Sequence, residues 1–487
     1  MAVVQENPTE TTKTPAKVES LTDILAMQRS AFLRDGAPSL EHRKSALEKL
    51  HRLMIEYKQD LLEAISSDFG NRSHHESLMA EVFITVNAIK HCKAKVGKWM
   101  KPKRAPIAFQ FKGLDGLAKG KVHYQPLGVV GIISPWNYPL QLAIVPIAQA
   151  LAAGNRVMLK PSELTPNTSE LLAKVLGENF SQEEVAVVTG GPEVGAEFSG
   201  LPFDHLFYTG STKIGRLVMQ AAAKNLVPVT LELGGKSPCI VGTEANLDRA
   251  VPAITGGKLL NAGQTCVAPD YTFVPKAKQE LFVEGFQKQA EAMYPTFGDN
   301  VQYTSIVSDG HYERIQHLLG DARAKGARIV EVNPHNEDLS GGRKIPPTLV
   351  LDVTEDMDIM HEEIFGPVMP IMSYDKIEDA VQYVNDHERP LALYYFGEDG
   401  SERDSVIGKT TSGGVCVNDT LFHLAQEELP FGGVGPSGIG SYHGERGFQT
   451  FSHEKSVFYQ SRFNTTGLFR APYGKVFDRV IGLLIGK

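Results

Sequence analysis

The chain has 487 residues, 42% hydrophobic and 22% charged, an ordinary globular balance with enough apolar material for two or three cores. A formal net charge of −8, with no basic stripe, argues against a nucleic-acid partner. Four cysteines without CxxC spacing exclude a disulfide framework and favour a reduced, cytoplasmic setting.

The two ends of the chain differ in pattern from its middle. Residues 1–19 are polar, so we expect a disordered tail and no signal peptide. Residues 20–68 and 77–100 carry apolar side chains at helical spacing and are predicted to be helical. Residues 467–487 predict an amphipathic tail that docks on the protein or a partner subunit, with a peripheral membrane contact as the alternative. They fall short of the about 20 apolar residues that span a bilayer, so we expect no stable membrane anchor.

Short apolar runs alternate with helical patterns from residue 123 onward. The predicted strands of the first half are 129–133, 157–161, 185–188 and 205–209, and the helices between them are 140–153, 167–178 and 213–223. The strands predicted within 235–430 are 238–241, 271–274, 348–351 and 414–417. Such alternation predicts two α/β domains with parallel sheets and right-handed crossovers.

Cys266 lies in a loop of small and polar residues, where it would be a poor core filler. Small neighbours let a substrate reach the sulfur, as a nucleophile requires. Upstream, Glu232 supplies a carboxylate that can activate water. A thiol and such a base can form and then hydrolyse a thioester. We expect nearby amides and positive charge to help ionise the thiol.

Asn137 lies in a stiff loop between Pro135 and Pro139, next to Trp136. A fixed amide N–H is what an oxyanion hole needs. Taken alone, an asparagine in such a loop is more often a turn former.

A turn after the predicted strand 205–209 is a candidate phosphate site. Gly210 permits the turn, and Ser211 and Thr212 can cap a helix whose N-terminal amides hold a phosphate. Gly215 completes a two-glycine pattern that many strand-to-helix turns share, so the pattern is weak by itself.

A second candidate cofactor contact follows the predicted strand 157–161. Lys160 and Glu163, on either side of Ser162, could hydrogen-bond ribose hydroxyls, because ligands bind beyond the carboxyl ends of parallel strands. A carboxylate there would repel a 2′-phosphate and favours NAD over NADP. Solvated charges after a strand are the alternative.

Glu363 and Phe365 precede a Gly-Pro turn and could reach a cofactor ribose and stack on a ring, although surface charge is the simpler interpretation. No His/Cys/Asp cluster has metal-ligand spacing, so no metal site is predicted.

Together these segments resemble the NAD(P)-dependent aldehyde dehydrogenase superfamily from about residue 20 to residue 465. The motifs that carry the resemblance are, in family order, PWNYP (135–139), KPSE (160–163), TGST (209–212), LELGGK (231–236), GQTC (263–266), EIFGP (363–367) and PFGG (430–433). The short N-terminus, the KPSEL form of the second motif and the aromatic-rich C-terminal extension are similar to the class 3 branch. Within that branch, the chain resembles bacterial coniferyl aldehyde dehydrogenases.

The resemblance implies an α/β fold of the aldehyde dehydrogenase type, with a Rossmann-like cofactor domain, a catalytic α/β domain and a small bridging hairpin. The implied boundaries are 20–106 with 124–234 for the cofactor-binding domain, 235–435 for the catalytic domain and 107–123 with 453–466 for the bridging element. Such a hairpin would expose sheet edges unless it paired with a second subunit, so a homodimer is predicted.

The resemblance also implies the reaction: oxidation of an aldehyde to the carboxylic acid with NAD, or NADP, through a thiohemiacetal and a thioester on Cys266. Asn137 and the Cys266 backbone N–H would hold the oxyanion, and Glu232 would deprotonate water. The residues it places at the cofactor are Trp136, Lys160, Ser162, Glu163, Gly210, Ser211, Gly215, Glu363 and Phe365.

The resemblance makes coniferyl aldehyde the first choice of substrate and a medium or long aliphatic aldehyde the second. Tyr138, Phe422 and Tyr442 could line an apolar funnel, which would suit either substrate. An acylating enzyme that transfers to coenzyme A is less favoured, since it needs no base at the position of Glu232. A binding protein on the same fold is disfavoured because the thiol, the glutamate and the asparagine are all present.

Overall fold

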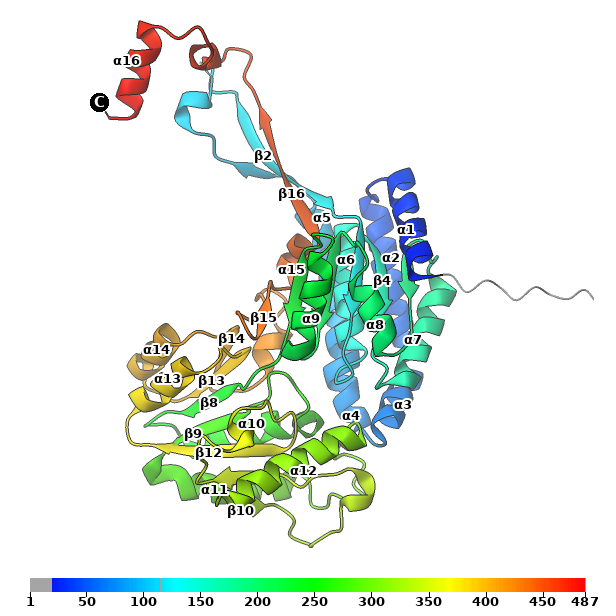
Figure 1. The fold of residues 1–487 in the computed structure, drawn as a ribbon, viewed down its shortest axis with the longest axis vertical. Coiled ribbons are helices and arrows are strands. Elements are labelled where there is room, and N and C mark those ends of the chain that lie inside the picture. Colours follow the sequence, from blue (N-terminus) through cyan, green and yellow to red (C-terminus); the bar gives the residue numbers. More distant parts are fainter. Residues whose placement is uncertain (1–19, 114, 487) are drawn as a thin grey trace, which may run out of the picture.

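The computed structural model describes residues 20–113 and 115–486 as two α/β layers and a projecting arm (Figure 1). The disordered tail predicted for residues 1–19 lies outside the described residues. Within the described ranges, no helix is long and apolar enough to cross a membrane.

The first layer is a six-stranded sheet in the order β15-β7-β6-β3-β4-β5. Its strands are β3 (Val129–Ile133), β4 (Arg156–Lys160), β5 (Val185–Val187), β6 (His205–Thr209), β7 (Val229–Glu232) and β15 (Gly438–Ile439). All neighbours are parallel except β15, which pairs antiparallel with β7. The four strands predicted here are confirmed, and β7 and β15 are additions.

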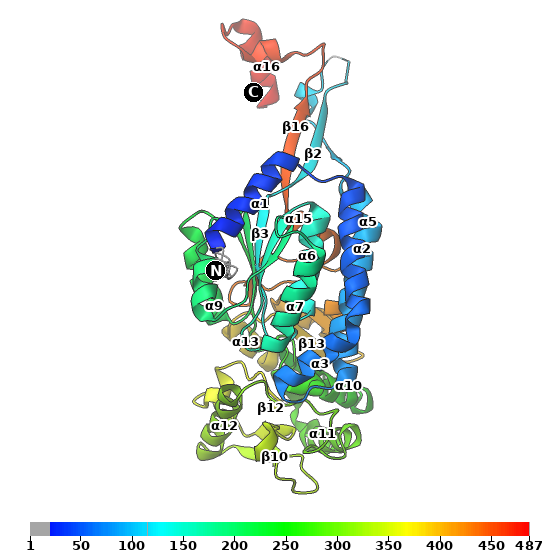
Figure 2. The same cartoon turned by 90° about the vertical axis from the view of Figure 1, so that its right-hand side faces the viewer.

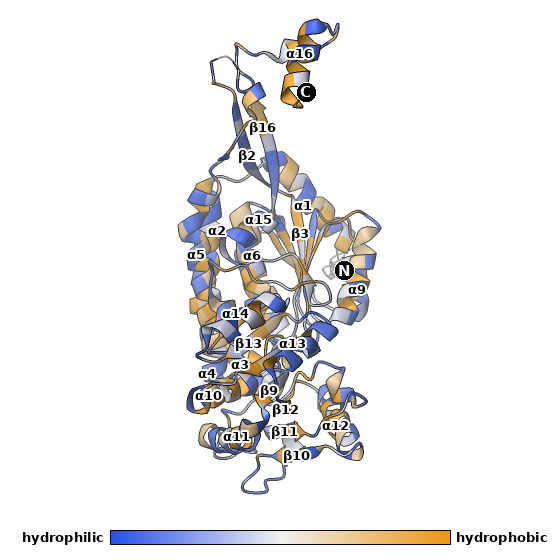
Figure 3. Ribbon diagram, turned by 90° about the vertical axis from the view of Figure 1, so that its left-hand side faces the viewer, coloured by the Kyte–Doolittle hydropathy of each residue, from blue (hydrophilic) through white to orange (hydrophobic). Residues whose placement is uncertain are grey.

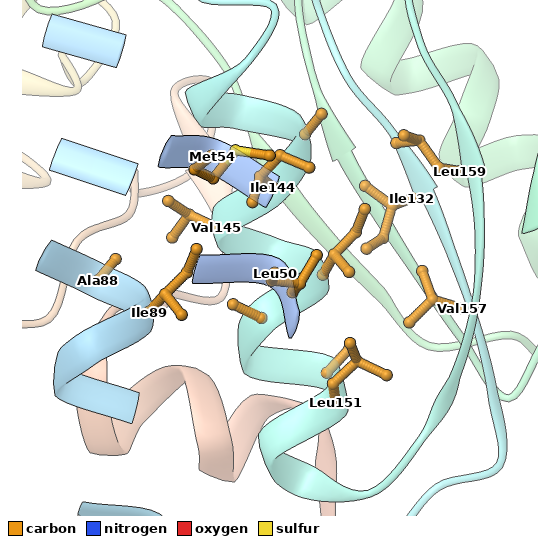
Figure 4. Packing of buried hydrophobic residues seen from close by; sticks show 14 of the residues in the cluster. Leu50, Met54, Ala88, Ile89, Ile132, Ile144, Val145, Leu151, Val157 and Leu159 are labelled. Carbon is orange, nitrogen blue, oxygen red and sulfur yellow. The ribbon is translucent and has the colours of Figure 1, made fainter. Parts of the chain in front are cut away.

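Helices cover both faces of this sheet (Figure 2). They are α1 (Leu21–Asp35), α2 (Leu40–Glu56), α3 (Lys58–Phe69), α4 (His74–Ser77), a π-helix η1 (Leu78–Phe83), α5 (Ile84–Trp99), α6 (Gln141–Ala153), α7 (Pro166–Asn179), α8 (Pro192–Ser199), α9 (Thr212–Ala223) and α15 (Gly444–Thr450). Figure 4 shows the packing on the α6 face, where Leu50 of α2, Ile89 of α5 and Ile144 of α6 meet Ile132 of β3. The predicted helical stretch 20–68 is three helices, because Ser39 caps a new one and Tyr57 ends it.

The second layer is a seven-stranded sheet in the order β10-β11-β12-β9-β8-β13-β14. Its strands are β8 (Pro238–Val241), β9 (Tyr271–Pro275), β10 (Arg328–Glu331), β11 (Thr348–Leu351), β12 (Val368–Tyr374), β13 (Ala392–Phe396) and β14 (Gly414–Val417), and the helices around them are α10 (Leu247–Leu259), α11 (Gln279–Met293), α12 (Asp309–Ala324), α13 (Ile377–Asp386) and α14 (Gly400–Lys409). Only β10 is antiparallel to its neighbour. All four strands predicted in this half are confirmed.

The arm is a three-stranded antiparallel sheet of β1 (Lys103–Ala105), β2 (Lys119–Pro126) and β16 (Ser452–Tyr459). Beyond it lies α16 (Lys475–Leu484), none of whose described residues is buried. The helix sits at the far end of the arm rather than on the body of its own chain (Figure 1), and many of its residues are hydrophobic (Figure 3). Docking on its own body, one of the three placements expected for this tail, is therefore not observed.

Candidate active site

A cavity of about 920 Å³ is lined by residues from both layers. Asn137 enters it from the loop after β3, Glu232 from the end of β7 and Cys266 from the loop after α10. The three predicted catalytic residues, far apart in the sequence, therefore share one cavity.

The loop that carries Cys266 has an unusual backbone. Asn261, Ala262 and Gly263 have φ values of 53°, 50° and 74°, three consecutive residues in the left-handed region. Such strain persists only where the surroundings over-determine the conformation. Gln264 does this with its buried side chain, which donates to the carbonyls of Asn261 (3.0 Å) and Ser305 (3.1 Å). It also accepts a hydrogen bond from the Val307 N–H at 3.0 Å.

Asn137 is held from two sides. Its side-chain Nδ2 donates to the main-chain oxygen of Gln264 at 3.2 Å, and its own main-chain oxygen accepts from Asn261 Nδ2 at 3.1 Å. A primary amide has two N–H groups, so one remains to donate into the cavity. A donor fixed in this way is preorganised for an oxyanion.

Tyr138 fixes the residue before the cysteine, since its hydroxyl lies 2.6 Å from Thr265 Oγ1. It does not line the cavity, whereas Phe431 and Tyr442 do. Phe422 is 60% exposed and is not part of the lining, so Tyr442 alone of the three predicted funnel residues lines the cavity. Phe431 is an aromatic lining residue that the sequence analysis did not name.

Glu232 is buried, and neither carboxylate oxygen has a hydrogen-bond partner among the described residues. Burial raises the pKa of this carboxyl well above its ordinary value. A carboxylate that burial destabilises in this way binds a proton more readily than an exposed one, as suits a general base.

The Cys266 thiol is harder to ionise than the sequence analysis expected. Burial, followed by the negative charges of Glu363 and Glu232, raises its pKa to about 12. The backbone N–H groups of Cys266 and Val267 act in the opposite direction, but more weakly. The expected help from amides is present, but burial and two carboxylates outweigh it, so this thiol needs a base before it can attack.

The candidate phosphate site also opens into the cavity. Gly210, Ser211 and Lys213 line it, and Ser211 caps α9 by accepting a hydrogen bond from the Ile214 N–H at 3.4 Å. Helix N-terminal amides and a lysine suit a pyrophosphate. Gly215 faces the protein instead, because a Cβ there would lie 2.6 Å from a side-chain carbon of Leu233.

Trp136, Glu363 and Phe365 line the same cavity. The rings of Trp136 and Phe365 meet edge to face, with 5.4 Å between centroids. Burial and the charge of Asp270 raise the pKa of Glu363 to about 8. A Cβ on Gly234 would lie 2.1 Å from a carboxylate oxygen of Glu363, so only glycine admits this close approach. These groups can hydrogen-bond a sugar and contact a ring.

Besides Gly215, three predicted cofactor residues lie outside the cavity lining. Lys160 ends β4 and donates to Glu163 at 2.6 Å, so each charge is met by the other. Ser162 Oγ accepts from the Leu164 N–H at 3.2 Å and closes a local turn. Their role in holding a cofactor stays a prediction.

Sequence patterns missed a buried ion pair between Arg72 and Glu81, in which Arg72 also contacts the main chain of Asn137. The pair lies in a polar stretch without a motif, so only the tertiary contact reveals it. No group of three or more His, Cys, Asp or Glu side chains in the described part of the chain could hold a metal ion.

Residues 7–457 match the aldehyde dehydrogenase family. The chain belongs to this family. It is 50% identical over 459 residues to the "Probable coniferyl aldehyde dehydrogenase" of Caulobacter vibrioides, covering 93% of this chain and 94% of that one. It is 46% identical to the "Coniferyl aldehyde dehydrogenase" of a Pseudomonas species, covering 97% of each.

Solved structures of other aldehyde dehydrogenases share the fold. The substrate-bound Staphylococcus aureus AldH superposes with a TM-score of 0.88 at 38% identity, covering 96% of this chain and all of that one. The NAD⁺ complex of the Bacillus cereus aldehyde dehydrogenase superposes with a TM-score of 0.80 at 29% identity, covering 91% of this chain and 89% of that one. The predicted aldehyde dehydrogenase fold is thus confirmed.

Replacing Gly263 with alanine should distort the cysteine loop of this aldehyde dehydrogenase. The residue has φ 74°, and a Cβ would lie 2.3 Å from the Gly366 carbonyl oxygen, so we expect a loss of about 2 kcal/mol or more in the free energy of unfolding. Urea denaturation measures it. Gly256→Ala in α10 is the matched control, because a Cβ there meets nothing within 4 Å. Equal stability of the two variants would show that the loop tolerates a side chain at this position.

Proposed function

We propose that this enzyme oxidises coniferyl aldehyde to ferulate, converting the aldehyde, water and NAD(P)⁺ into the carboxylate, NAD(P)H and two protons. The observation that carries the proposal is the convergence of Cys266, Glu232 and Asn137 in a cavity that the capped start of α9 also lines. The names of the two coniferyl aldehyde dehydrogenase relatives support the choice of substrate. The aromatic walls formed by Phe431 and Tyr442 are compatible with a planar ring.

In the first step the Cys266 sulfur forms a bond to the aldehyde carbon, and the carbonyl electron pair moves to the oxygen. Because the pKa of the thiol is raised, its proton must pass to a base, and Glu232, buried without a partner, receives it. The Asn137 side-chain N–H and the Cys266 backbone N–H stabilise the oxyanion.

NAD(P), when bound, supplies the acceptor for the hydride that leaves the thiohemiacetal carbon, and a thioester on Cys266 remains. Glu232 first releases the thiol proton to solvent, and its carboxylate then takes a proton from the water that attacks this thioester and returns it to the leaving Cys266 sulfur. The carbon–sulfur bond breaks, and the acid leaves.

For the cofactor we propose the same residues as the resemblance implied. Ser211 and the start of α9 hold the pyrophosphate, Lys160 and Glu163 the adenosine ribose, and Glu363 with Phe365 the nicotinamide ribose and ring. The lining of the cavity supports the first and last of these contacts, and the NAD⁺ complex of the Bacillus cereus relative supports the choice of cofactor.

The substrate is tested by following reduced cofactor with purified protein, NAD and either coniferaldehyde or decanal, in the absence of coenzyme A. We expect kcat/KM for coniferaldehyde to exceed that for decanal by at least about tenfold, a difference of 1.4 kcal/mol. A preference for decanal would replace coniferaldehyde by an aliphatic substrate. Turnover that requires coenzyme A would replace hydrolysis by acyl transfer.

The Glu232→Gln variant tests the base. We expect a slowed burst of reduced cofactor, no larger than one per active site, followed by a still slower steady rate, lowered about 10²–10⁴-fold. The burst slows because the thiol loses the group that takes its proton, and the steady rate falls further because the thioester lacks an activated water. Rapid-mixing absorbance separates the two phases. Cys266→Ala should abolish both, whereas Cys416→Ala, which removes the other half-buried thiol, should abolish neither. An unchanged steady rate in Glu232→Gln would remove Glu232 as the base.

We further propose that the chain forms a homodimer through the arm, in which 107–123 and 453–466 bridge two subunits. Its outer strands β1 and β16 have one unpaired edge each among the described residues, and open edges invite pairing. Mass photometry should give about twice 53.3 kDa. Phe458→Glu in β16 should shift the mass towards the monomer, whereas Leu33→Glu, an exposed apolar position on α1, should not. A monomeric wild type would contradict this assembly.

A further inference from the structure

Three charged residues of one short segment contact both catalytic loops. They are Arg72, Glu76 and Glu81, which lie before, within and after α4, and the last is in the π-helix η1. One catalytic loop, residues 134–140, carries Asn137, and the other, residues 260–267, carries Cys266. A π-turn is an irregularity that occurs frequently at functional sites, so its contacts are of interest here.

Arg72 holds the Asn137 loop by its main chain. Its side chain is fully buried, and Nη1 donates both to Glu81 at 2.9 Å and to the Asn137 main-chain oxygen at 2.8 Å. The guanidinium also lies over the rings of Phe69 and Tyr138, at 5.0 Å and 4.8 Å from their centroids. These contacts fix the orientation of the guanidinium plane as well as the position of its charge.

Glu81 fixes the other end of the same loop. Its second carboxylate oxygen accepts from the N–H groups of Leu140 and Gln141, both at 2.9 Å, where α6 begins. The pair Arg72–Glu81 thus holds Asn137 itself and the residues that follow it.

Glu76 reaches across to the cysteine loop. One oxygen accepts from the Asn261 N–H at 3.1 Å and from Thr304 Oγ1 at 3.0 Å, and the other lies 3.3 Å from the Tyr294 hydroxyl. Asn261 is the first of the three left-handed residues, and its own side chain donates to the Asn137 main-chain oxygen. The Asn137 main-chain oxygen therefore accepts hydrogen bonds both from Arg72 and from Asn261 of the cysteine loop.

Stability alone does not account for this arrangement. Removing two charges fully from water is costly, and apolar pairs of similar volume often stabilise a protein as well. What the ion pair supplies, and apolar side chains do not, is a directed set of hydrogen bonds to named backbone atoms.

We propose that Arg72, with Glu81, is a positioning residue that sets the Asn137 amide against Cys266 for the oxidation. This inference rests on the function proposed above, because it assigns Asn137 to the oxyanion. A donor displaced by about 1 Å can cost a factor of 10², so the effect belongs in the rate of the acylation step.

A double-mutant cycle tests it. We expect Arg72→Met to slow the burst of reduced cofactor about 10²-fold, with little change in the affinity for NAD measured by fluorescence titration. If Arg72 acts through Asn137, the same change in an Asn137→Ala background should cost less than about threefold. Losses that multiply independently in the double variant would overturn the proposal.

Two further variants guard against misfolding. Arg72→Met combined with Glu81→Gln removes the unpaired buried charge yet keeps an acceptor for Leu140 and Gln141, and it should show the same slow burst. Arg43→Met is the matched control, because Arg43 is also buried and donates to main-chain oxygens, those of Pro38 and Ala152, at the other end of α6. A burst slowed equally in Arg43→Met would reduce Arg72 to a general structural role.

Hydrolysis of 4-nitrophenyl acetate separates this inference from the proposed function, since the ester needs the thiol and the oxyanion donor but neither cofactor nor aldehyde. If the wild type cleaves the ester without oxidising aldehydes, the proposed function fails while the cycle on ester cleavage still decides the role of Arg72. If the wild type does neither, both proposals fall. Non-additive losses in both reactions support the positioning role.

Discussion

The hydrogen bond from the Asn137 side chain to the Gln264 main-chain oxygen connects the two layers at the point where chemistry is proposed. Asn137 lies in the loop after β3 of the six-stranded sheet, and Gln264 lies in the loop that leads to Cys266. The geometry of this hydrogen bond depends on how firmly the two loops that carry its donor and acceptor are held. That explains the density of buried contacts behind each loop, including a left-handed backbone that costs energy and is retained by the Gln264 side chain.

Burial governs the electrostatics of the cavity. It is the largest cause of the raised pKa values of Cys266, Glu232 and Glu363, and each carboxylate then adds to the effect on the thiol. A site of this kind does not hold a thiolate ready at neutral pH. It holds a neutral thiol beside a carboxyl that can exchange a proton, so nucleophilicity depends on proton transfer inside the cavity. A low dielectric also strengthens the action of the Asn137 amide on any oxyanion.

The sequence predicted the strands that are short, apolar and bounded by turn residues, such as β3 and β6, because these properties are local. Strand β12 escaped prediction, and Pro370 in its middle interrupts the pattern that identifies a strand. The proposed catalytic residues could be named from the sequence because each lies in a motif with a chemical reason. The Arg72–Glu81 pair could not be found in this way, since its function depends on which loop the fold brings against it.

The strand order relates the predicted cofactor residues Lys160 and Glu163 to the cavity that they do not line. Along the six-stranded sheet, the neighbours β7, β6, β3 and β4 are parallel, so their carboxyl ends share one edge. Glu232, Gly210, Asn137 and Lys160 lie at those four ends in that order. Ligands of open parallel sheets bind at this edge, and a dinucleotide is long enough to pass several strands. The Lys160–Glu163 pair lies at the same edge of the sheet as the cavity, one strand beyond Asn137. A dinucleotide bound in the cavity would reach this pair with its far end.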